Sequence, residues 1–295
     1  MKFRFWGVRG SIPSPGPHTV RYGGNTTCIE VRSDDDTLII LDGGTGIFAL
    51  AQSLLNRLPV QANIFITHTH WDHIHGLPFF TPLFIPGNSV RLYGASDPVT
   101  GGGVEQVMAV QLQYSFFPVR EAEMKAAISY QSLAIGETVS VGDATVTATL
   151  LNHPVIDLGY RISCNGKSLF FTGDHEPHYN IYEPGEAGHA EYQASIDERL
   201  RTIDDAMRGV DALIVDCSYT KDEYPAKKGW GHGHYDGAIA TALRVGARHL
   251  YCTHHEPTRS DDELERIFAD VMARHAGQLG GLQVRLAYEG MEVEL

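Results

Sequence analysis

Four histidines of this 295-residue chain lie within eight residues, at His68, His70, His73 and His75, in the segment ITHTHWDHIHG. The apolar run before them predicts a short strand over 62–67. Side chains two residues apart beyond a strand point the same way, so the first two histidines could bind one metal ion. Asp72 and the third histidine would then turn toward a second ion. The spacing therefore predicts a metal site at a rigid strand end.

Further candidate ligands each directly follow an apolar run that predicts a strand. They are His153 in LLNHP, Asp174 in FTGDHE and His254 in YCTHH. Residues placed just beyond several strands can converge on one end of a sheet. Considered singly, each could equally be an ordinary strand-end or turn residue. Together they could complete the site that the histidine cluster begins.

The elements that would position these residues alternate between strands and helices. Strands are predicted over 2–6, 27–32, 37–41, 62–67, 138–141, 144–151, 158–163, 167–172, 212–216 and 249–253, with a final strand pair closing at Glu294. Helices are predicted over 47–56, 104–113, 120–127, 190–207, 235–245 and 261–276. This alternation predicts an α/β fold, an αββα sandwich in which two mixed sheets pack face to face with helices outside.

The composition is that of an ordinary globular protein, with 43% hydrophobic and 20% charged residues. No repeat with a period of roughly 20–50 residues is visible, so we expect a single domain over residues 1–295. The longest apolar runs fall far short of the ~18 residues that a transmembrane helix needs. No signal-peptide pattern opens the chain. We therefore expect a cytoplasmic protein without a membrane partner.

Charge and cysteine content exclude further classes. The 23 basic and 36 acidic residues give a net charge of −13, which opposes the electrostatic attraction behind most non-specific nucleic-acid binding. A duplex-coating protein is therefore disfavoured. The four cysteines form no CxxC pair, so the sequence predicts neither a thiolate zinc site nor a disulfide framework.

Taken together, these motifs resemble the metallo-β-lactamase fold superfamily. The resemblance rests on LDGG at Asp42, on HTHWDH over 68–73, and on the three strand-end residues described above. The segment GWGHGHYDGA, which contains His232, is similar to an additional histidine motif of the phosphodiesterase branch. That branch includes tRNA 3′-processing endonucleases and cyclic-nucleotide phosphodiesterases. Its members often have Ser-Thr after the histidine, where this chain has Gly233 and His234.

The resemblance implies two divalent metal ions held by seven side chains, of which one bridges. One ion would be held by His68, His70 and His153. The other would be held by Asp72, His73 and His254, with Asp174 as the bridge. Nitrogen and carboxylate donors without thiolate suit Zn²⁺ best, and Mn²⁺ or Fe²⁺ stay open. Asp42 would orient the ligands from outside, although a plain Asp-Gly turn is the alternative interpretation.

Two such ions lower the pKa of a shared water and clamp a phosphodiester for attack. Asp72 would help to orient the nucleophile, and His232 would give the leaving alkoxide its proton, because the pKa of histidine suits that task near pH 7. The alternative for His232 is an ordinary loop histidine in a glycine-rich turn. Lys227 and Lys228 could bind substrate phosphate, or they could form a solvated basic turn. The sequence assigns no role to His234 or His255.

The leading hypothesis is a dinuclear-metal-dependent phosphodiesterase that hydrolyses a small cyclic or linear nucleotide. A tRNA 3′-end endonuclease is an alternative that the net charge disfavours. A thioester or lactone hydrolase on the same metals would not need His232. A non-enzymatic, metal-stabilised binding module is disfavoured because structural zinc sites are usually closed by four protein ligands. The sequence leaves open whether the chain forms a homodimer.

Overall fold

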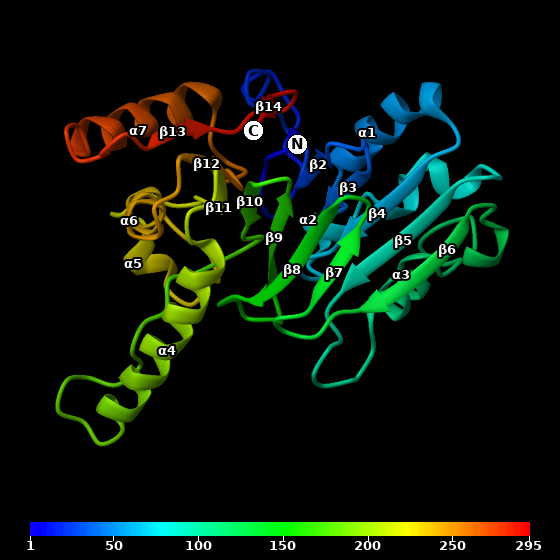
Figure 1. The fold of residues 1–295 in the computed structure, drawn as a ribbon. Coiled ribbons are helices and arrows are strands. Elements are labelled where there is room, and N and C mark those ends of the chain that lie inside the picture. Colours follow the sequence, from blue (N-terminus) through cyan, green and yellow to red (C-terminus); the bar gives the residue numbers. More distant parts are fainter.

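Two seven-stranded sheets form the centre of the molecule, and helices cover the outer face of each (Figure 1). The structure is a computed structural model that describes residues 1–295. The predicted αββα sandwich of two mixed sheets is confirmed. None of the helices combines the length and apolar character needed to cross a membrane.

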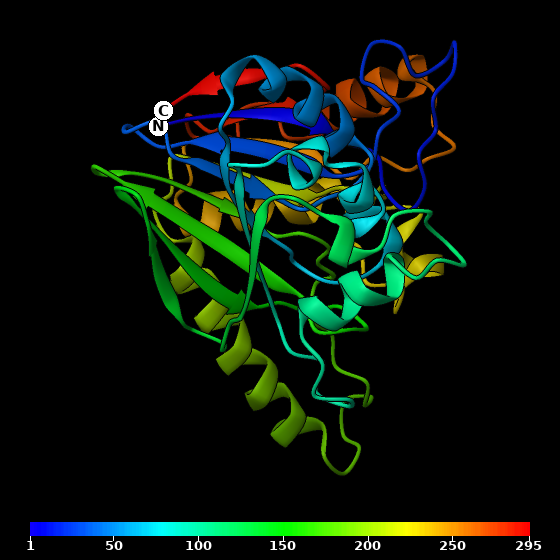
Figure 2. The ribbon, with the colours of Figure 1, turned by 90° about the vertical axis from the view of Figure 1, so that its right-hand side faces the viewer.

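The first sheet has the strand order β14-β1-β2-β3-β4-β5-β6. Its strands are β1 (Lys2–Gly7), β2 (Cys28–Arg32), β3 (Leu38–Leu41), β4 (Gln61–Phe65), β5 (Ser89–Gly94), β6 (Ala127–Ser132) and β14 (Glu292–Glu294). Strands β3 to β6 run parallel, whereas β14, β1, β2 and β3 pair antiparallel. The two chain ends therefore lie side by side, as both ribbon views show (Figure 2).

The second sheet has the order β13-β12-β11-β10-β9-β8-β7. Its strands are β7 (Thr138–Val141), β8 (Ala144–Leu150), β9 (Leu158–Cys164), β10 (Lys167–Phe171), β11 (Ala212–Asp216), β12 (His249–Thr253) and β13 (Gln283–Leu286). Strands β10 to β13 are parallel, and β9 is antiparallel to both β8 and β10. The carboxyl ends of β8, β10, β11 and β12 therefore share one edge.

The main core lies between the sheets and is rich in aromatic rings. Phe3 of β1 and Tyr251 of β12 meet edge to face across the interface, with ring centroids 5.3 Å apart. Burial of such rings is the main stabilising contribution, and the T-shaped geometry adds about 0.5–1.5 kcal/mol per pair.

Helices cover both outer faces through separate apolar clusters. The first sheet carries α1 (Gly46–Leu54) and α3 (Val104–Gln111), and the second carries α4 (His189–Met207), α6 (Tyr235–Val245) and α7 (Asp261–Arg274). Short helices are α2 (Trp71–Ile74) and α5 (Tyr224–Lys227), and 3₁₀ turns cover Leu55–Arg57, Leu77–Phe79, Thr81–Phe84 and Glu121–Glu123. The buried side of α6 repeats at the spacing of an amphipathic helix, and the helix ends at Gly246, which has a φ of 70°.

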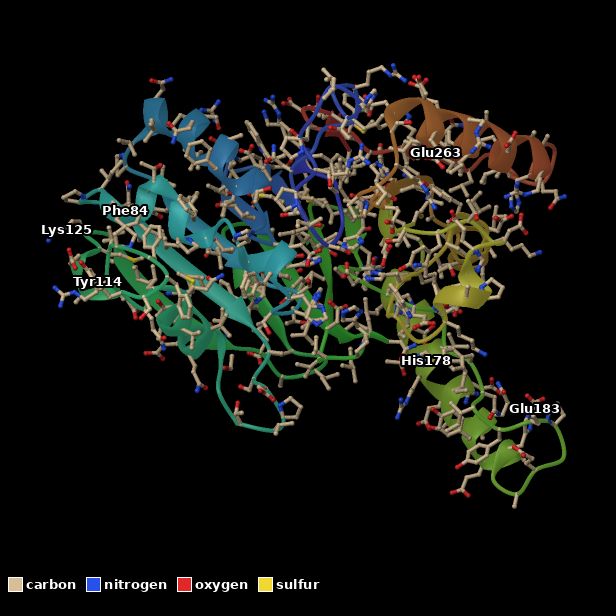
Figure 3. The ribbon with its side chains drawn as sticks, turned by 180° about the vertical axis from the view of Figure 1, so that it is seen from behind. Phe84, Tyr114, Lys125, His178, Glu183 and Glu263 are labelled. Atoms are coloured by element: carbon tan, nitrogen blue, oxygen red, sulfur yellow. The ribbon has the colours of Figure 1, made fainter.

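Helix α4 extends beyond the body of the protein (Figure 1). Its buried residues are Ile196, Ile203 and Met207, and none of them lies in the first seven residues of the helix. Figure 3 places His178 at the root of this projection and Glu183 farther out. The first turns of α4 and the segment before them therefore have little contact with the core.

Two expectations about the elements were wrong, and two strands were not expected. The predicted helix over 120–127 is only a 3₁₀ turn, Glu121–Glu123, because the N–H groups of Lys125 and Ala126 donate to the carbonyl of Leu83 instead of continuing a helix. Strands β5 and β6 were not predicted. The final strands do not pair with each other, because β13 joins β12 in one sheet and β14 joins β1 in the other.

Candidate metal centre

The candidate metal centre lies where strand ends of the two sheets face each other. His68 follows β4 of the first sheet, while His153, Asp174 and His254 follow β8, β10 and β12 of the second. The sheets are hydrogen-bonded and packed on a common core, so the side chains extend from a rigid frame. The fold thus brings together residues that lie up to 186 positions apart in the sequence.

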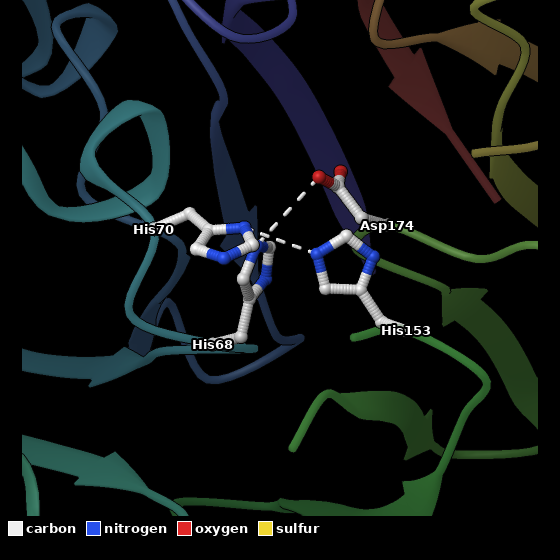
Figure 4. Close-up of side chains that lie close together, drawn as sticks. All are labelled: His68, His70, His153 and Asp174. Atoms are coloured by element: carbon white, nitrogen blue, oxygen red, sulfur yellow. Dashed lines mark hydrogen bonds and ion pairs between the residues drawn. The ribbon is translucent and has the colours of Figure 1, made fainter. Parts of the chain in front are cut away.

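One group of donors consists of His68, His70, His153 and Asp174, whose ligand atoms all lie within 4.8 Å of one another (Figure 4). His153 Nε2 lies 3.0 Å from His70 Nδ1, and His68 Nε2 lies 3.6 Å from Asp174 Oδ2. Three imidazole nitrogens and one carboxylate oxygen therefore face a common centre, as in a four-coordinate zinc site.

A second group consists of Asp72, His73, Asp174 and His254, again within 4.8 Å. His73 Nε2 lies 3.2 Å from Asp174 Oδ1, and His254 Nε2 lies 3.0 Å from the same oxygen. Asp72 Oδ2 lies 3.1 Å from His254 Nε2. The two oxygens of Asp174 thus face different groups, which is the placement that a bridging carboxylate needs.

Several inward-facing donor atoms have no hydrogen-bond partner. His68 Nε2, His73 Nε2 and Asp174 Oδ1 are buried and make no hydrogen bond; the oxygen contacts are close but not aligned as hydrogen bonds. Buried polar atoms are normally satisfied, and leaving one unpaired costs about 1–3 kcal/mol. Cations at the two centres would satisfy all three atoms, so the residues present fit a pair of divalent ions.

The charge of the site also fits cations. Burial alone would lower the pKa of His73, but Asp174, Asp72 and Asp42 outweigh burial and raise that pKa well above its usual value. The carboxylates thus stabilise a positive charge at this position, and a divalent ion can supply that charge in place of a proton. Burial lowers the pKa of His68 well below its usual value, so its imidazole is neutral, the form that binds metals.

The histidine rings keep one nitrogen directed at the donor groups because their other ring nitrogen contacts a residue outside these groups. His73 Nδ1 donates to Asp42 Oδ2 at 2.7 Å, and His153 Nδ1 donates to the carbonyl of Gly231 at 2.9 Å. His254 Nδ1 lies 3.0 Å from Ser218 Oγ. Such outer contacts fix the tautomer and the ring orientation of a metal-binding histidine.

Asp157 holds His68 in a similar way, with its Oδ1 3.0 Å from His68 Nδ1 in a close polar contact that is not aligned as a hydrogen bond. Burial, together with the charges of Asp174 and Asp42, raises the pKa of Asp157 well above its usual value. Sequence reasoning missed this residue. The available signal was its place directly before β9, which starts at the edge where β8 ends.

Two glycines let the backbone approach the ligands. A Cβ on Gly10 would lie 2.3 Å from His254 ring atoms, and one on Gly231 would lie 2.3 Å from His153 Nδ1. Gly231 also has a φ of 88°, which side chains rarely allow. Next to Gly10, the N–H of Ser11 donates to Asp72 Oδ2 at 2.8 Å. The amino-terminal loop therefore closes directly on the second group.

His232 lies beside both groups. Its Nδ1 is 2.8 Å from Asp216 Oδ2, and its ring stacks on that of His254 with centroids 4.9 Å apart. Burial lowers the pKa of His232, but Asp216 and then Asp174 outweigh burial and raise it to about 9. Its side chain is 14% exposed whereas that of Asp216 is fully buried. Asp216 therefore orients His232 and leaves Nε2 free for another partner.

The turn that carries His232 is anchored by the buried carboxylate of Glu176. Glu176 accepts from the N–H of Gly229 at 2.7 Å, from the N–H of Gly231 at 2.9 Å and from the hydroxyl of Tyr224 at 3.0 Å. The sequence analysis did not single out Glu176, although it stands two residues after Asp174.

Two histidines without a sequence-based role have structural ones. His234 Nδ1 accepts from the N–H of Gly237 and so caps the start of α6. His255 is buried, and its Nε2 donates to the carbonyl of Ala287 at 2.8 Å. Neither faces the donor groups.

The chain belongs to the family described as "Beta-lactamase superfamily domain", whose model matches residues 37–255. This match and the fold confirm the predicted superfamily. The matched range contains all seven predicted ligands as well as Asp42 and His232.

Among curated proteins, a ribonuclease Z of Limosilactobacillus fermentum is 26% identical over 259 residues, covering 78% of this chain and 77% of that protein. Among solved structures, a new diphosphatase from the PhnP family is 20% identical with a TM-score of 0.64, covering 100% of this chain and 97% of that one. Unliganded yeast PDE1 is 17% identical with a TM-score of 0.66, covering 100% and 99%. These three proteins are hydrolases by name, and the chain is a metal-dependent hydrolase of this superfamily.

Proposed function

We propose that this protein is a phosphodiesterase with two metal ions that hydrolyses a small cyclic or linear nucleotide. His68, His70 and His153 would hold one ion. Asp72, His73 and His254 would hold the other, and Asp174 would bridge them. Zn²⁺ suits these nitrogen and carboxylate donors best.

The observation that carries the proposal is the position of the His232–Asp216 pair beside two donor groups that share Asp174. Hydrolysis of a phosphodiester adds a water oxygen to phosphorus, breaks the bond to the leaving alkoxide and gives that alkoxide a proton. Two bound ions would supply an activated water and neutralise phosphate charge. His232, oriented by Asp216, would donate the proton, and Asp72 would help to orient the water.

The alternatives make different demands on the same residues. A thioester or lactone hydrolase would not need the proton from His232. A tRNA 3′-end endonuclease is supported by the name of the ribonuclease Z relative, whereas the net charge of −13 opposes binding of a long polyanion. A metal-stabilised binding module without activity does not account for the hydrolase relatives.

The substrate class can be tested with chromogenic esters. The metal-loaded protein should hydrolyse bis(p-nitrophenyl) phosphate well above the monoester, and a small nucleotide should compete better than tRNA. His73→Ala is the control, because it removes a ligand. Turnover of nitrocefin or a thioester, without any phosphodiester hydrolysis, would contradict the proposal. Efficient cutting of precursor tRNA at its 3′ end would favour the endonuclease.

The role of His232 can be separated from metal binding. His232→Ala should keep both metals and the fold, yet lose ~10²–10⁴-fold in turnover of substrates with alkoxide leaving groups. With a nitrophenolate leaving group, which needs little protonation, the loss should be much smaller. Both rates are measured on metal-replete protein. Equal losses on both substrates, or no loss on either, would refute the role of His232 as the acid.

A further inference from the structure

A loop with several aromatic residues and lysines leads from β11 to His232. It spans residues 217–231 and contains α5. Tyr219 forms a β-bridge with His234, and Glu176 holds the glycine turn at the other end. The side chains of this loop therefore start from fixed backbone positions next to His232.

Two lysines of this loop lie over aromatic rings. The ammonium of Lys227 is 4.1 Å from the centre of the Trp230 ring and 5.9 Å from that of Tyr219. The ammonium of Lys228 is 3.9 Å from the ring centre of Tyr179. Neither lysine forms an ion pair, although the chain has 13 more acidic than basic residues. Each ammonium is therefore a positive charge that no carboxylate neutralises.

Trp230 is a large apolar side chain left in solvent, 58% exposed. The backbone N–H of Trp230 donates to the carbonyl of Lys227 at 3.0 Å, which fixes the Trp230 backbone beside the lysine. An exposed ring of this kind is a surface on which a nucleobase can stack. The Lys227 ammonium and the Trp230 ring thus lie together in the loop, five and two residues before His232.

The position of Lys227 and Trp230 relative to His232 indicates which part of a substrate would reach these two side chains. The Tyr219 ring lies 6.0 Å from the ring of His232, centre to centre, and its centre lies 5.9 Å from the Lys227 ammonium, so it neighbours both groups. In the proposed reaction, His232 gives its proton to the leaving alkoxide. Whatever extends past His232 toward this loop therefore belongs to the leaving group.

We propose that Lys227 and Trp230 form a subsite for a leaving nucleoside that carries a phosphate group of its own. The base would stack on Trp230, and the additional phosphate would bind Lys227. The inference rests on the proposed phosphodiesterase activity and narrows its substrate class to di- and oligonucleotides. A cyclic mononucleotide has no second phosphate to place there.

The test compares the dinucleotides ApA, pApA and ApAp on metal-loaded protein, after product analysis has shown which nucleoside leaves. A terminal phosphate on the leaving nucleoside should lower KM about 10-fold, and one on the other nucleoside should not, because one charge-assisted hydrogen bond between an ammonium and a phosphate contributes about this much. Lys227→Gln should bring the KM ratio close to one, and Lys227→Arg should retain most of it. Trp230→Leu should raise KM for all three about 10-fold.

Lys221→Gln is the matched control, because Lys221 is an exposed lysine of the same loop with no ring beneath its ammonium; the KM ratio should survive this change. A ratio near one in the parent protein, or a ratio that survives Lys227→Gln, would overturn the subsite while hydrolysis of bis(p-nitrophenyl) phosphate still supported the phosphodiesterase. Absence of hydrolysis of every phosphodiester by metal-loaded protein would overturn both.

Discussion

At the scale of single residues, the ligands depend on partners that do not face the metals. Asp157 and Asp42 hold the outer nitrogens of His68 and His73, and each is fully buried. Mutation of such partners typically weakens metal binding 10–100-fold. The geometry therefore assigns part of the metal affinity to residues outside the ligand set.

Asp157→Asn should accordingly lower the affinity for metal about 10–100-fold, because the amide cannot reproduce the contact of the carboxyl group with His68 Nδ1. Competition with a chromogenic chelator measures this affinity. Asp211→Asn is the control, since Asp211 is also buried but contacts Ser168 and Arg248 at the opposite end of β11. Unchanged affinity in Asp157→Asn, or equal losses in both variants, would show that Asp157 does not orient a ligand.

The sequence was informative where chemistry is contiguous. The contiguous motif HTHWDH by itself predicts a metal site, and His153, Asp174 and His254 stand at predicted strand ends. Asp157 stands directly before a predicted strand and Ser218 two residues after one, but position alone does not reveal their roles, because their contacts with His68 and His254 exist only once distant strands are assembled. An isolated Asp or Ser before or after a strand is ordinarily a turn residue.

At the scale of elements, the loop before His232 behaves as one unit anchored on Glu176. The carboxylate accepts three hydrogen bonds from this loop, and the carbonyl of Gly231 in the same turn holds His153. The loop thus links the proposed acid to a proposed ligand. Displacement of a reacting group by about 1 Å can cost ~10²-fold in rate.

Glu176→Gln should loosen this loop, because an amide has one acceptor oxygen for three donors. Turnover of alkoxide substrates should fall about 10–100-fold, and that of nitrophenyl substrates should fall less, as for His232→Ala. Steady-state rates on both substrates, with metal content, measure the effect. Glu186→Gln, at an exposed site on the projecting segment, should change neither rate. Unaltered rates in Glu176→Gln would show that Glu176 is not needed to hold the loop before His232 in place.

Elements were predictable where their patterns were strong. β12 was predicted to the residue and α6 with both ends, since each has an apolar pattern with clear boundaries. β6 was missed because it lies at a sheet edge, where half-buried positions give only weak alternation. The partners of β13 and β14 depend on long-range packing that no local pattern encodes.

At the scale of the whole molecule, many carboxylates are buried at one edge of the sandwich. Asp42, Asp72, Asp157 and Asp174 are all buried there, and their mutual repulsion opposes folding unless cations are bound. Ligands that bind only the folded state add about 4 kcal/mol of stability at 1,000 times their Kd. The metals would therefore contribute to stability as well as to catalysis.

Removal of metal with a chelator should lower Tm by about 10 °C, given the usual shift per kcal/mol in large domains. Differential scanning calorimetry, with and without restored Zn²⁺, measures this. The Tm of His73→Ala should respond much less, because one ion has lost a ligand. A Tm that is indifferent to chelation in the parent protein would mean that the buried carboxylates are satisfied without cations.

The most direct test of the central claim is a metal titration of chelated protein, followed by hydrolysis of bis(p-nitrophenyl) phosphate. Two donor groups that share Asp174 predict that activity is complete only when two Zn²⁺ ions are bound per chain, with bound metal measured in the same samples. Full activity with one ion bound, or bound metal without any phosphodiester hydrolysis, would contradict the dinuclear phosphodiesterase.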